Sequence, residues 1–321
     1  MRVGLIGPSD RPEIVRLAIR VEERGAEPVV LDSRKDSAIR IAADGLSACG
    51  VDLDGLTAVF VSDLGLRPPW VRDENGRCDV EASERALRSS RRKLAAWNAI
   101  LEWLARRITV VNPPRTYDLH ALKPWEMTVY EGAGLPVPRT IATSDPETLV
   151  GLGGSCRTGW IRKDMSGGHG YTERFEPPAG VEEAQRELGT GPLMVQEFVE
   201  GDNVRAFVLG GEVIGAAETV SLDGAATDSR RGEIRVRRVT LPEEAARTAV
   251  RAAALCGMPY TAVDFMRDEV SGRYLLLECN SSPFFVNFDR LSGCDISGRI
   301  ADYLVGRRRG GGAGGSAEAR T

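Results

Sequence analysis

The chain has 321 residues, which is too long for one small hydrophobic core and favours two or three lobes. Its formal net charge of −4 gives no electrostatic reason to expect nucleic-acid or anionic-membrane binding, and no apolar run reaches bilayer-spanning length. Six scattered cysteines and a strand-like start without a signal peptide predict a cytoplasmic protein with reduced thiols. The two histidines, His120 and His169, leave little material for a zinc site or a serine–histidine mechanism.

The first part of the chain alternates predicted strands and helices. Strands at 2–7, 28–32 and 58–62 accompany a helix that begins near Pro12, with Ser9 or Asp10 as its cap. This alternation predicts a parallel, doubly wound sheet. A dinucleotide loop after the first strand is not favoured, because the third glycine of that motif is missing.

A polar stretch at 68–80 is predicted to be a loop, and residues 81–106 have the periodicity of one long helix. The basic run within this helix is interpreted as a solvated face rather than a nucleic-acid patch, because the chain as a whole is acidic. A short strand at 108–111 follows. Pro124, directly after Lys123, predicts that the next helix begins there.

A glycine-rich segment follows the predicted strand at 159–163. Closely spaced glycines let a backbone fold over phosphates and donate amide hydrogens, and Lys163 at the strand end would add a compact positive charge. The spacing does not fit a Walker-type loop. The segment therefore predicts a phosphate-covering lid, consisting of Ser166, Gly167, Gly168, His169 and Gly170.

Near the C-terminus, two apolar runs at 260–267 and 273–280 predict a β-hairpin. Folding it about Ser271 places Asp264 opposite Glu278, and Asn280 shares the face of Glu278 because it lies two residues further on. Two close carboxylates repel unless a cation lies between them. Oxygen ligands of this kind suit Mg²⁺, with Mn²⁺ as an alternative.

Taken in order, these motifs resemble those of the ATP-grasp superfamily, in particular its RimK-like and glutathione-synthetase-like carboxylate–amine ligases. The resemblance implies a mixed α/β and α+β protein with the ATP-grasp fold behind an N-terminal open α/β, or pre-ATP-grasp, domain. It implies an N-terminal domain at 1–112, a central lobe with the lid at 113–191 and a C-terminal lobe with the metal site at 192–306. The composition of 307–321, which is basic and then rich in Gly, Ser and Ala, predicts a disordered tail.

The resemblance also implies roles for individual residues. Lys123, Lys163 and the lid, including His169, would contact the nucleotide phosphates. Arg205, Lys163 and Arg231 would assist catalysis, and Asp264, Glu278 and Asn280 would bind the metal. The nucleotide's base and ribose would meet a hinge segment that comprises Gln196, Glu197, Val199, Asp202 and Asn203.

The predicted reaction is ATP-dependent amide formation between a carboxylate and an amine through an acyl phosphate, with release of ADP and phosphate. The substrates are small molecules or peptides, with neither nucleic acid nor membrane involved, and homo-oligomer formation is left open. The alternatives are a peptide-modifying macrocyclase, a non-catalytic ATP-binding regulatory module and, last, a glycoside hydrolase using Asp264 and Glu278.

No residue is a clear general base for removing the proton of the attacking amine. Phe284 and Phe285 stand where the family has a glycine, which predicts an altered acceptor pocket or a packing role.

Overall fold

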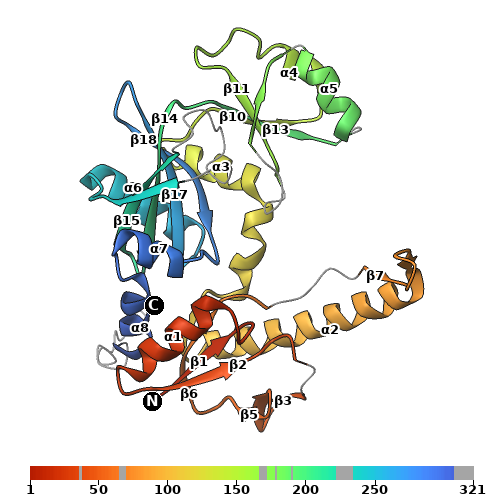
Figure 1. The fold of residues 1–321 in the computed structure, drawn as a ribbon, viewed down its shortest axis with the longest axis vertical. Coiled ribbons are helices and arrows are strands. Elements are labelled where there is room, and N and C mark those ends of the chain that lie inside the picture. Colours follow the sequence, from red (N-terminus) through yellow and green to blue (C-terminus); the bar gives the residue numbers. More distant parts are fainter. Residues whose placement is uncertain are drawn as a thin grey trace, which may run out of the picture. The chain divides into compact units, whose positions relative to one another are not determined.

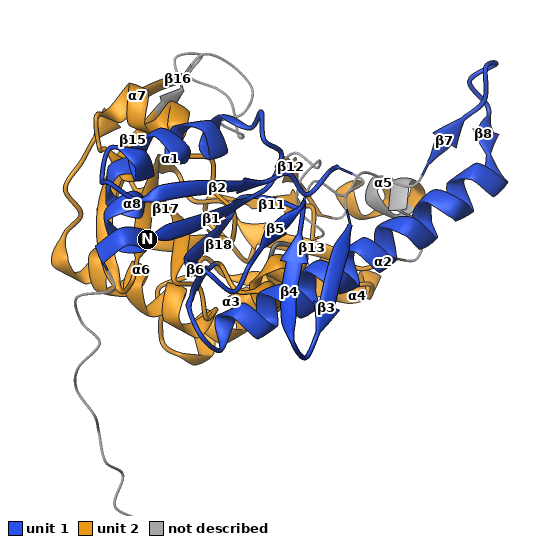
Figure 2. Cartoon of the chain, turned by 90° about the horizontal axis from the view of Figure 1, so that it is seen from below, with its two compact units in different colours: residues 1–111, 297–321 blue, residues 112–296 orange. Residues whose placement is uncertain are grey.

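The computed structural model describes residues 1–35, 38–64, 70–165, 172–177, 179–188, 191–221 and 234–306. It divides into two compact units (Figure 2). Unit 1 combines Met1–Val111 with the segment that starts at Ser297, and unit 2 comprises Asn112–Ile296. Within the described ranges, no helix is both long and apolar enough to cross a membrane.

Unit 1 is built on a four-stranded parallel sheet in the order β2-β1-β6-β9, as the alternating pattern predicts (Figure 1). Its strands are β1 (Arg2–Ile6), β2 (Glu27–Leu31), β6 (Leu56–Val61) and β9 (Thr109–Val111). The helices of this unit are α1 (Pro12–Glu22), α2 (Val80–Ala105) and α8 (Ile296–Gly306). A small antiparallel sheet of β3 (Ile39–Ala42), β4 (Gly45–Ala48) and β5 (Val51–Asp52) was not predicted.

Two local predictions in unit 1 are wrong. The N-cap of α1 is Arg11, which makes no side-chain cap, because the hydroxyl of Ser9 donates to Asp32 Oδ2 at 2.7 Å instead. The polar stretch predicted to be a loop contains a hairpin of β7 (Val71–Arg72) and β8 (Cys78–Asp79). Asp73 stabilises its turn by accepting hydrogen bonds from the backbone amides of Asn75 and Arg77.

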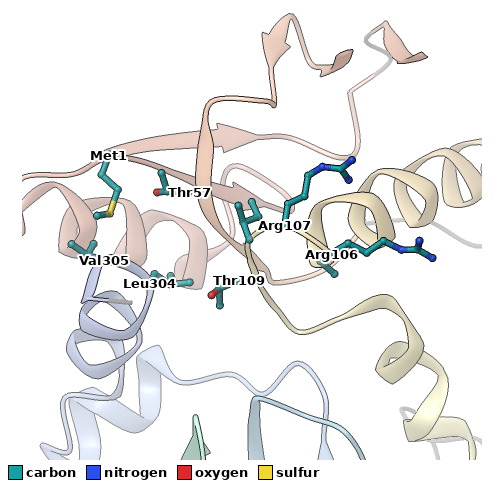
Figure 3. A pocket seen from close by; sticks show the side chains of 9 residues that line it. Met1, Thr57, Arg106, Arg107, Thr109, Leu304 and Val305 are labelled. Atoms are coloured by element: carbon teal, nitrogen blue, oxygen red, sulfur yellow. The ribbon is translucent and has the colours of Figure 1, made fainter. Parts of the chain in front are cut away.

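The C-terminal helix α8 belongs to unit 1, although the predicted boundary at 306 includes it in the C-terminal lobe. Arg24, which lies just after α1, binds it by an ion pair with Asp302 at 2.5 Å and a hydrogen bond to the Gly298 carbonyl oxygen at 2.9 Å. A cavity of about 390 Å³ in this unit is lined by residues that include Thr57, Arg106 and Leu304 (Figure 3). None of the predicted site residues lines it. The tail at 307–321 lies outside the described residues.

Unit 2 begins with the 3₁₀ helix η1 (Pro114–Ala121) and α3 (Lys123–Gly132), which starts at the predicted residue. A four-stranded sheet follows in the order β10-β13-β11-β12. Its elements are β10 (Thr140–Thr143), α4 (Pro146–Val150), β11 (Trp160–Lys163), β12 (Glu173–Phe175), α5 (Ala179–Leu188) and β13 (Leu193–Glu197). Because β13 pairs with both β10 and β11, it lies in the central sheet, whereas the predicted boundary at 191 assigns it to the next lobe.

The second sheet of unit 2 is antiparallel, in the order β16-β15-β14-β17-β18. Its strands are β14 (Gly201–Leu209), β15 (Glu212–Ser221), β16 (Ile234–Arg238), β17 (Tyr260–Asp268) and β18 (Tyr274–Asn280). The accompanying helices are α6 (Glu243–Leu255) and α7 (Val286–Ser292). β17 and β18 form the predicted hairpin.

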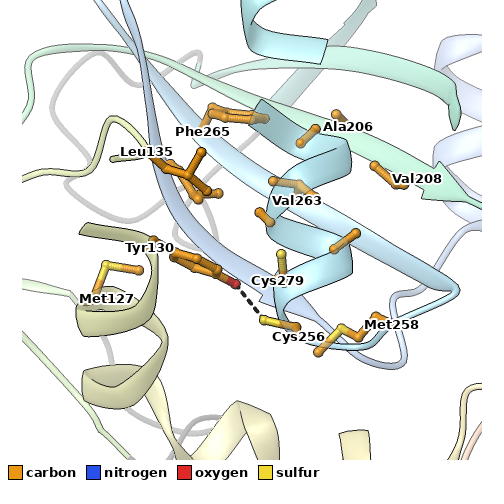
Figure 4. Close-up of a cluster of buried hydrophobic side chains, with 14 of the residues drawn as sticks. Met127, Tyr130, Leu135, Ala206, Val208, Cys256, Met258, Val263, Phe265 and Cys279 are labelled. Atoms are coloured by element: carbon orange, nitrogen blue, oxygen red, sulfur yellow. Dashed lines mark hydrogen bonds between the residues drawn. The ribbon is translucent and has the colours of Figure 1, made fainter. Parts of the chain in front are cut away.

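One face of this sheet builds the main core of unit 2 (Figure 4). Alternate residues such as Val263 and Phe265 of β17 are fully buried there, together with Cys279 of β18 and Tyr130 of α3. Since successive side chains of a strand point to opposite sides, the intervening residues face away from this core. The core thereby determines which residues the other face can present.

The side chain of Asn112 fixes the start of β17. It is 1% exposed, and its Nδ2 donates to the carbonyl oxygens of Tyr260 and Ser281 at 2.6 and 2.5 Å. Its Oδ1 accepts from the Tyr260 amide at 3.0 Å. Asn112 therefore joins both ends of the hairpin, since Tyr260 opens β17 and Ser281 directly follows β18.

Asn112→Ala should lower the free energy of unfolding by about 3 kcal/mol, because it leaves a buried amide and two buried carbonyls without their partner. Chemical denaturation monitored by circular dichroism measures this change. Asn75→Ala, which alters an exposed asparagine of the β7–β8 hairpin, is the matched control and should change stability by less than about 0.5 kcal/mol. Equal stability of Asn112→Ala and the wild type would contradict the assigned role.

Candidate functional site

Three charged residues lie side by side across three neighbouring strands of the second sheet in unit 2. The register pairs Arg205 of β14 with Asp264 of β17, and Asp264 with Glu278 of β18. Asn280 pairs with Ala262, two residues from Asp264. The hairpin thus brings Asp264, Glu278 and Asn280 together, with Arg205 next to them. We call Arg205, Asp264 and Glu278 the charged row.

The register of the hairpin depends on a β-bulge. From Arg267–Tyr274 to Phe265–Leu276 the pairs are regular, but the next pair is Asp264–Glu278, which leaves Leu277 as an extra residue. The bulge lets Leu276 and Cys279 both stay in the core while Glu278 pairs with Asp264. A bulge beside a functional site commonly re-aims a side chain in this way.

Asp264 is only 6% exposed, and a buried carboxylate needs partners. Arg205 binds it bidentately, with Nε to Oδ1 and Nη2 to Oδ2 both at 2.7 Å. Asn280 Nδ2 donates to Asp264 Oδ2 at 3.1 Å. The carboxylate raises the pKa of Arg205 above its usual range, chiefly by direct attraction, so the guanidinium stays charged.

Glu278 is surrounded by cations. Lys123, the first residue of α3, places its Nζ 3.0 Å from Glu278 Oε2. Burial opposes ionisation of Glu278 most strongly, but the charges of Lys123, Lys163 and Arg205 outweigh it and lower the pKa of Glu278. Lys163, at the end of β11, therefore acts on the same carboxylate from the other sheet. Three cations therefore lie near two carboxylates. The net positive charge that remains favours the binding of a further anion here.

The side chains of the predicted hinge residues contact other parts of unit 2. Gln196 is 1% exposed, and its Nε2 donates to Thr140 Oγ1 at 2.8 Å, so its side chain belongs to the packing of the central sheet. Glu197 accepts from Cys156 Sγ at 3.1 Å, and its amide donates to the Arg139 carbonyl. Val199 is buried in the segment that leaves the sheet.

Asp202 and Asn203 face opposite sides of β14, because they are neighbours on one strand. Asn203 lies two residues before Arg205 and shares its face. Asp202 lies on the other face and forms an ion pair with Arg267, which also lies 3.6 Å from Glu218. Of the two candidates for a ribose contact, only Asn203 lies on the side of the charged row.

Some predicted site residues lie outside the described residues. These are Ser166, Gly167, Gly168, His169 and Gly170 of the lid, and Arg231.

The two phenylalanines after the hairpin differ in burial. Phe285 is fully buried and packs edge-on against Tyr260 with ring centroids 6.5 Å apart, whereas Phe284 is 65% exposed. The packing role therefore applies to Phe285.

Sequence reasoning missed a buried polar cluster behind the charged row. Glu126 Oε1 accepts from the Tyr130 hydroxyl at 3.0 Å and from Cys256 Sγ at 3.6 Å, and Cys279 lies within 4.8 Å of this group. Burial, reinforced by Cys256, raises the pKa of Glu126 to about 9. The spacing of Glu126 and Tyr130 is an ordinary helical one, so only the tertiary structure reveals the cluster.

Comparison with known proteins identifies the fold that carries the charged row. Residues 181–304 match the family of RimK-like ATP-grasp domains. This chain carries a RimK-like ATP-grasp domain. The predicted mixed α/β architecture with the ATP-grasp fold is confirmed, and the family match covers all of the charged row.

Solved ATP-grasp structures resemble nearly the whole chain. A structure of the ATP-grasp ligase PsnB complexed with a minimal precursor shares 26% identity and superposes with a TM-score of 0.82, covering 95% of this chain and 98% of that one. The macrocyclase MdnC of Microcystis aeruginosa, bound with the precursor peptide MdnA, shares the fold at 19% identity, with a TM-score of 0.75 and coverage of 95% and 99%.

A curated relative is a probable alpha-L-glutamate ligase of Picosynechococcus, which is 29% identical over 191 residues. The aligned part is 57% of this chain and 62% of that protein. The match therefore spans less than two thirds of the length of this relative.

Glu126→Gln should make stability less dependent on pH. The folded state raises the pKa of Glu126 from 4.5 to about 9, so the folded protein keeps a proton that the unfolded chain loses. This contribution is complete below the unfolded pKa and is lost as pH rises toward 9, by up to about 1.4 kcal/mol per pH unit.

Urea unfolding of both proteins at pH 6, 7 and 8 measures the effect. The variant should gain stability relative to the wild type as pH rises. Glu131→Gln, an exposed carboxyl of the same helix, is the control and should follow the wild type. Parallel pH profiles for Glu126→Gln and the wild type would show that Glu126 is ionised in the folded protein.

Proposed function

We propose that the chain is an ATP-dependent ligase that joins a carboxylate to an amine through an acyl phosphate and releases ADP and phosphate. The observation that carries this proposal is the charged row, whose two carboxylates lie among Lys123, Lys163 and Arg205 within a RimK-like ATP-grasp domain. Phosphoryl transfer needs mainly positioning and charge neutralisation, and this set of side chains suits both.

The donor set fits a divalent metal ion. Asp264 and Glu278 offer carboxylate oxygens, and Asn280, whose Nδ2 bonds to Asp264, would offer Oδ1. When bound, Mg²⁺, or Mn²⁺ in its place, would neutralise charge on the ATP phosphates. A structure of PsnB contains Mg and ADP together with a phosphomimetic variant of its minimal precursor, which supports the assignment by similarity.

The proposed roles of the chain's own residues follow from their charges. Lys123 and Lys163 bind phosphate oxygens of ATP, and the fork of Arg205 can bind two oxygens of the transferred phosphoryl group at once. A substrate carboxylate oxygen forms a bond to the γ-phosphorus of ATP while the bond to ADP breaks. The amine nitrogen then attacks the carbonyl carbon, phosphate leaves with the C–O electrons, and the nitrogen loses a proton to solvent.

The proposal also assigns roles to the remaining predicted contacts. The lid 166–170 covers the phosphates and excludes water, which would otherwise hydrolyse the acyl phosphate. Asn203 is preferred over Asp202 for the ribose because it shares the face of Arg205. The segment around Val199 holds the base through its backbone, and Arg231 contacts the substrate or its phosphate.

A peptide substrate is the second, finer proposal. It is supported by similarity: PsnB, whose structures contain its precursor, superposes on 95% of this chain at 26% identity. On this proposal both reacting groups lie on one peptide, and the product is a macrocycle or cross-linked peptide.

We further propose that the protein acts in the cytoplasm, with neither nucleic acid nor membrane as a partner.

A panel assay for ADP release tests both proposals. Purified protein with ATP and Mg²⁺ is offered free amino acids, glutamate-containing dipeptides and longer peptides that carry both carboxylates and amines. Release that depends on both groups supports ligation, and loss of one water from a single peptide supports the macrocyclase. Binding of ATP without release across the panel favours a regulatory module, for which the two carboxylates of the charged row have no evident purpose.

Glu278→Gln should reduce kcat at least about a hundredfold, because it removes one charge from the metal-binding set while preserving the shape of the side chain. Its melting temperature should change little by comparison. Glu269→Gln, an exposed carboxyl in the turn of the same hairpin, serves as control and should retain wild-type turnover. Full activity of Glu278→Gln would refute the metal assignment.

A further inference from the structure

The face that carries the charged row continues across the remaining strands of the sheet. Arg205 of β14 pairs with Ala217 of β15, and Ala217 pairs with Arg238 of β16. Directly paired residues of neighbouring strands lie on the same face of a sheet, so Arg238 shares the face of Asp264 and Glu278. It stands two strands beyond Arg205, about 10 Å away at the backbone. Ala217 between them carries only a methyl group, so no charged side chain separates the two arginines along this row.

Arg238 differs from Arg205 and Lys123 in the partners that the protein offers it. Arg205 is held by Asp264, and Lys123 by Glu278. Arg238 is exposed, and within the residues that the structure describes its guanidinium makes neither a hydrogen bond nor an ion pair. An arginine with an open planar fork can bind a carboxylate from outside through two parallel hydrogen bonds.

The other two arginines of β16 lie on the opposite face. Arg237 pairs with Glu218, and its Nη2 donates to Glu218 Oε2 at 2.6 Å. Arg235 lies two residues before Arg237 and therefore shares its face. Of the three arginines of β16, Arg238 alone is on the side of the charged row. The strand thus provides a matched control, since Arg235 is equally exposed but on the other side.

The contacts of Arg205 turn its side chain away from Arg238. Its Nε and Nη2 both bind Asp264 of β17, which neighbours β14 on the side opposite to β15 and β16. The two arginines are therefore directed toward different parts of this face. Two forks arranged in this way suit two separate anionic groups rather than one.

We propose that Arg238 is a specificity-determining residue that binds a second carboxylate of the substrate. The inference rests on the proposed function, in which the carboxylate that becomes phosphorylated lies at Arg205. The substrate class is then an acid with two carboxylates, supplied either by a free acidic amino acid or by neighbouring acidic side chains of a peptide. An amide of the same shape lacks the charge and offers only one oxygen, so the site selects against it.

Isothermal titration calorimetry in the presence of ADP and Mg²⁺ tests the proposal with two pairs of probes. One pair is glutamate and glutamine, and the other is triglutamate and triglutamine. The wild type should bind the acidic member of at least one pair about tenfold more tightly. A preference confined to the single amino acids assigns the second carboxylate to a free amino acid, and a preference between the tripeptides assigns it to a peptide.

Arg238→Gln should lose this preference and keep the wild-type affinity for ADP. Arg235→Gln makes the same change on the other face of the strand and should keep both. Arg238→Lys retains the charge without the fork, so its preference should fall about threefold, which tests the proposal if Arg238→Gln does not fold. The proposal is overturned if the wild type shows no preference within either pair, including by binding none of the probes. An unaltered preference in either Arg238 variant, or weaker ADP binding by Arg238→Gln, also overturns it.

These titrations need no turnover, so they separate this site from the reaction. A preference for the acidic probes that depends on Arg238, in a protein that releases no ADP in the panel assay, would support the carboxylate site and refute ligation. Substrate-dependent ADP release without that preference would support ligation and refute the role of Arg238.

Discussion

The mutual repulsion of Asp264 and Glu278 is the constraint on which the site depends. They lie directly opposite each other on neighbouring strands, and one of them is almost fully buried. Neighbouring carboxylates repel each other unless positive charge lies beside them. Arg205 supplies that charge on one side and Lys123 on the other, while Lys163 acts from the second sheet. The same cations would bind a polyphosphate, so the interactions that preserve the carboxylates also prepare the proposed site for ATP.

The core behind the sheet determines where these charges lie. Val263, Phe265 and Cys279 are buried on one face, and the bulge at Leu277 lets Glu278 pair with Asp264 without exposing Leu276. Asn112 holds both ends of the hairpin by its side chain. The charged row is therefore positioned by buried contacts that do not themselves take part in chemistry.

Local patterns predicted the parts of the fold whose causes are local. Pro124 marks the start of α3, apolar runs that alternate with helical segments mark the strands of the parallel sheet in unit 1, and the hairpin of β17 and β18 follows from two apolar runs around a polar turn. The β7–β8 hairpin was missed because its strands are short and polar and depend on Ser83 of α2. The burial of Gln196 and the altered ionisation of Glu126 were equally out of reach, since both depend on contacts with residues distant in sequence. Counting outward from Ser271 predicted that Asp264 lies opposite Glu278, although the ladder reaches this pair only through the bulge at Leu277.

The most direct measurement of the central claim is the affinity for ADP by isothermal titration calorimetry, with and without Mg²⁺. The wild type should bind ADP much more tightly when Mg²⁺ is present, and Asp264→Asn should lose most of that increment while keeping the metal-free affinity. If Mg²⁺ leaves the affinity of the wild type unchanged, or if the variant keeps the full increment, the carboxylates of the charged row do not hold a metal ion against a nucleotide.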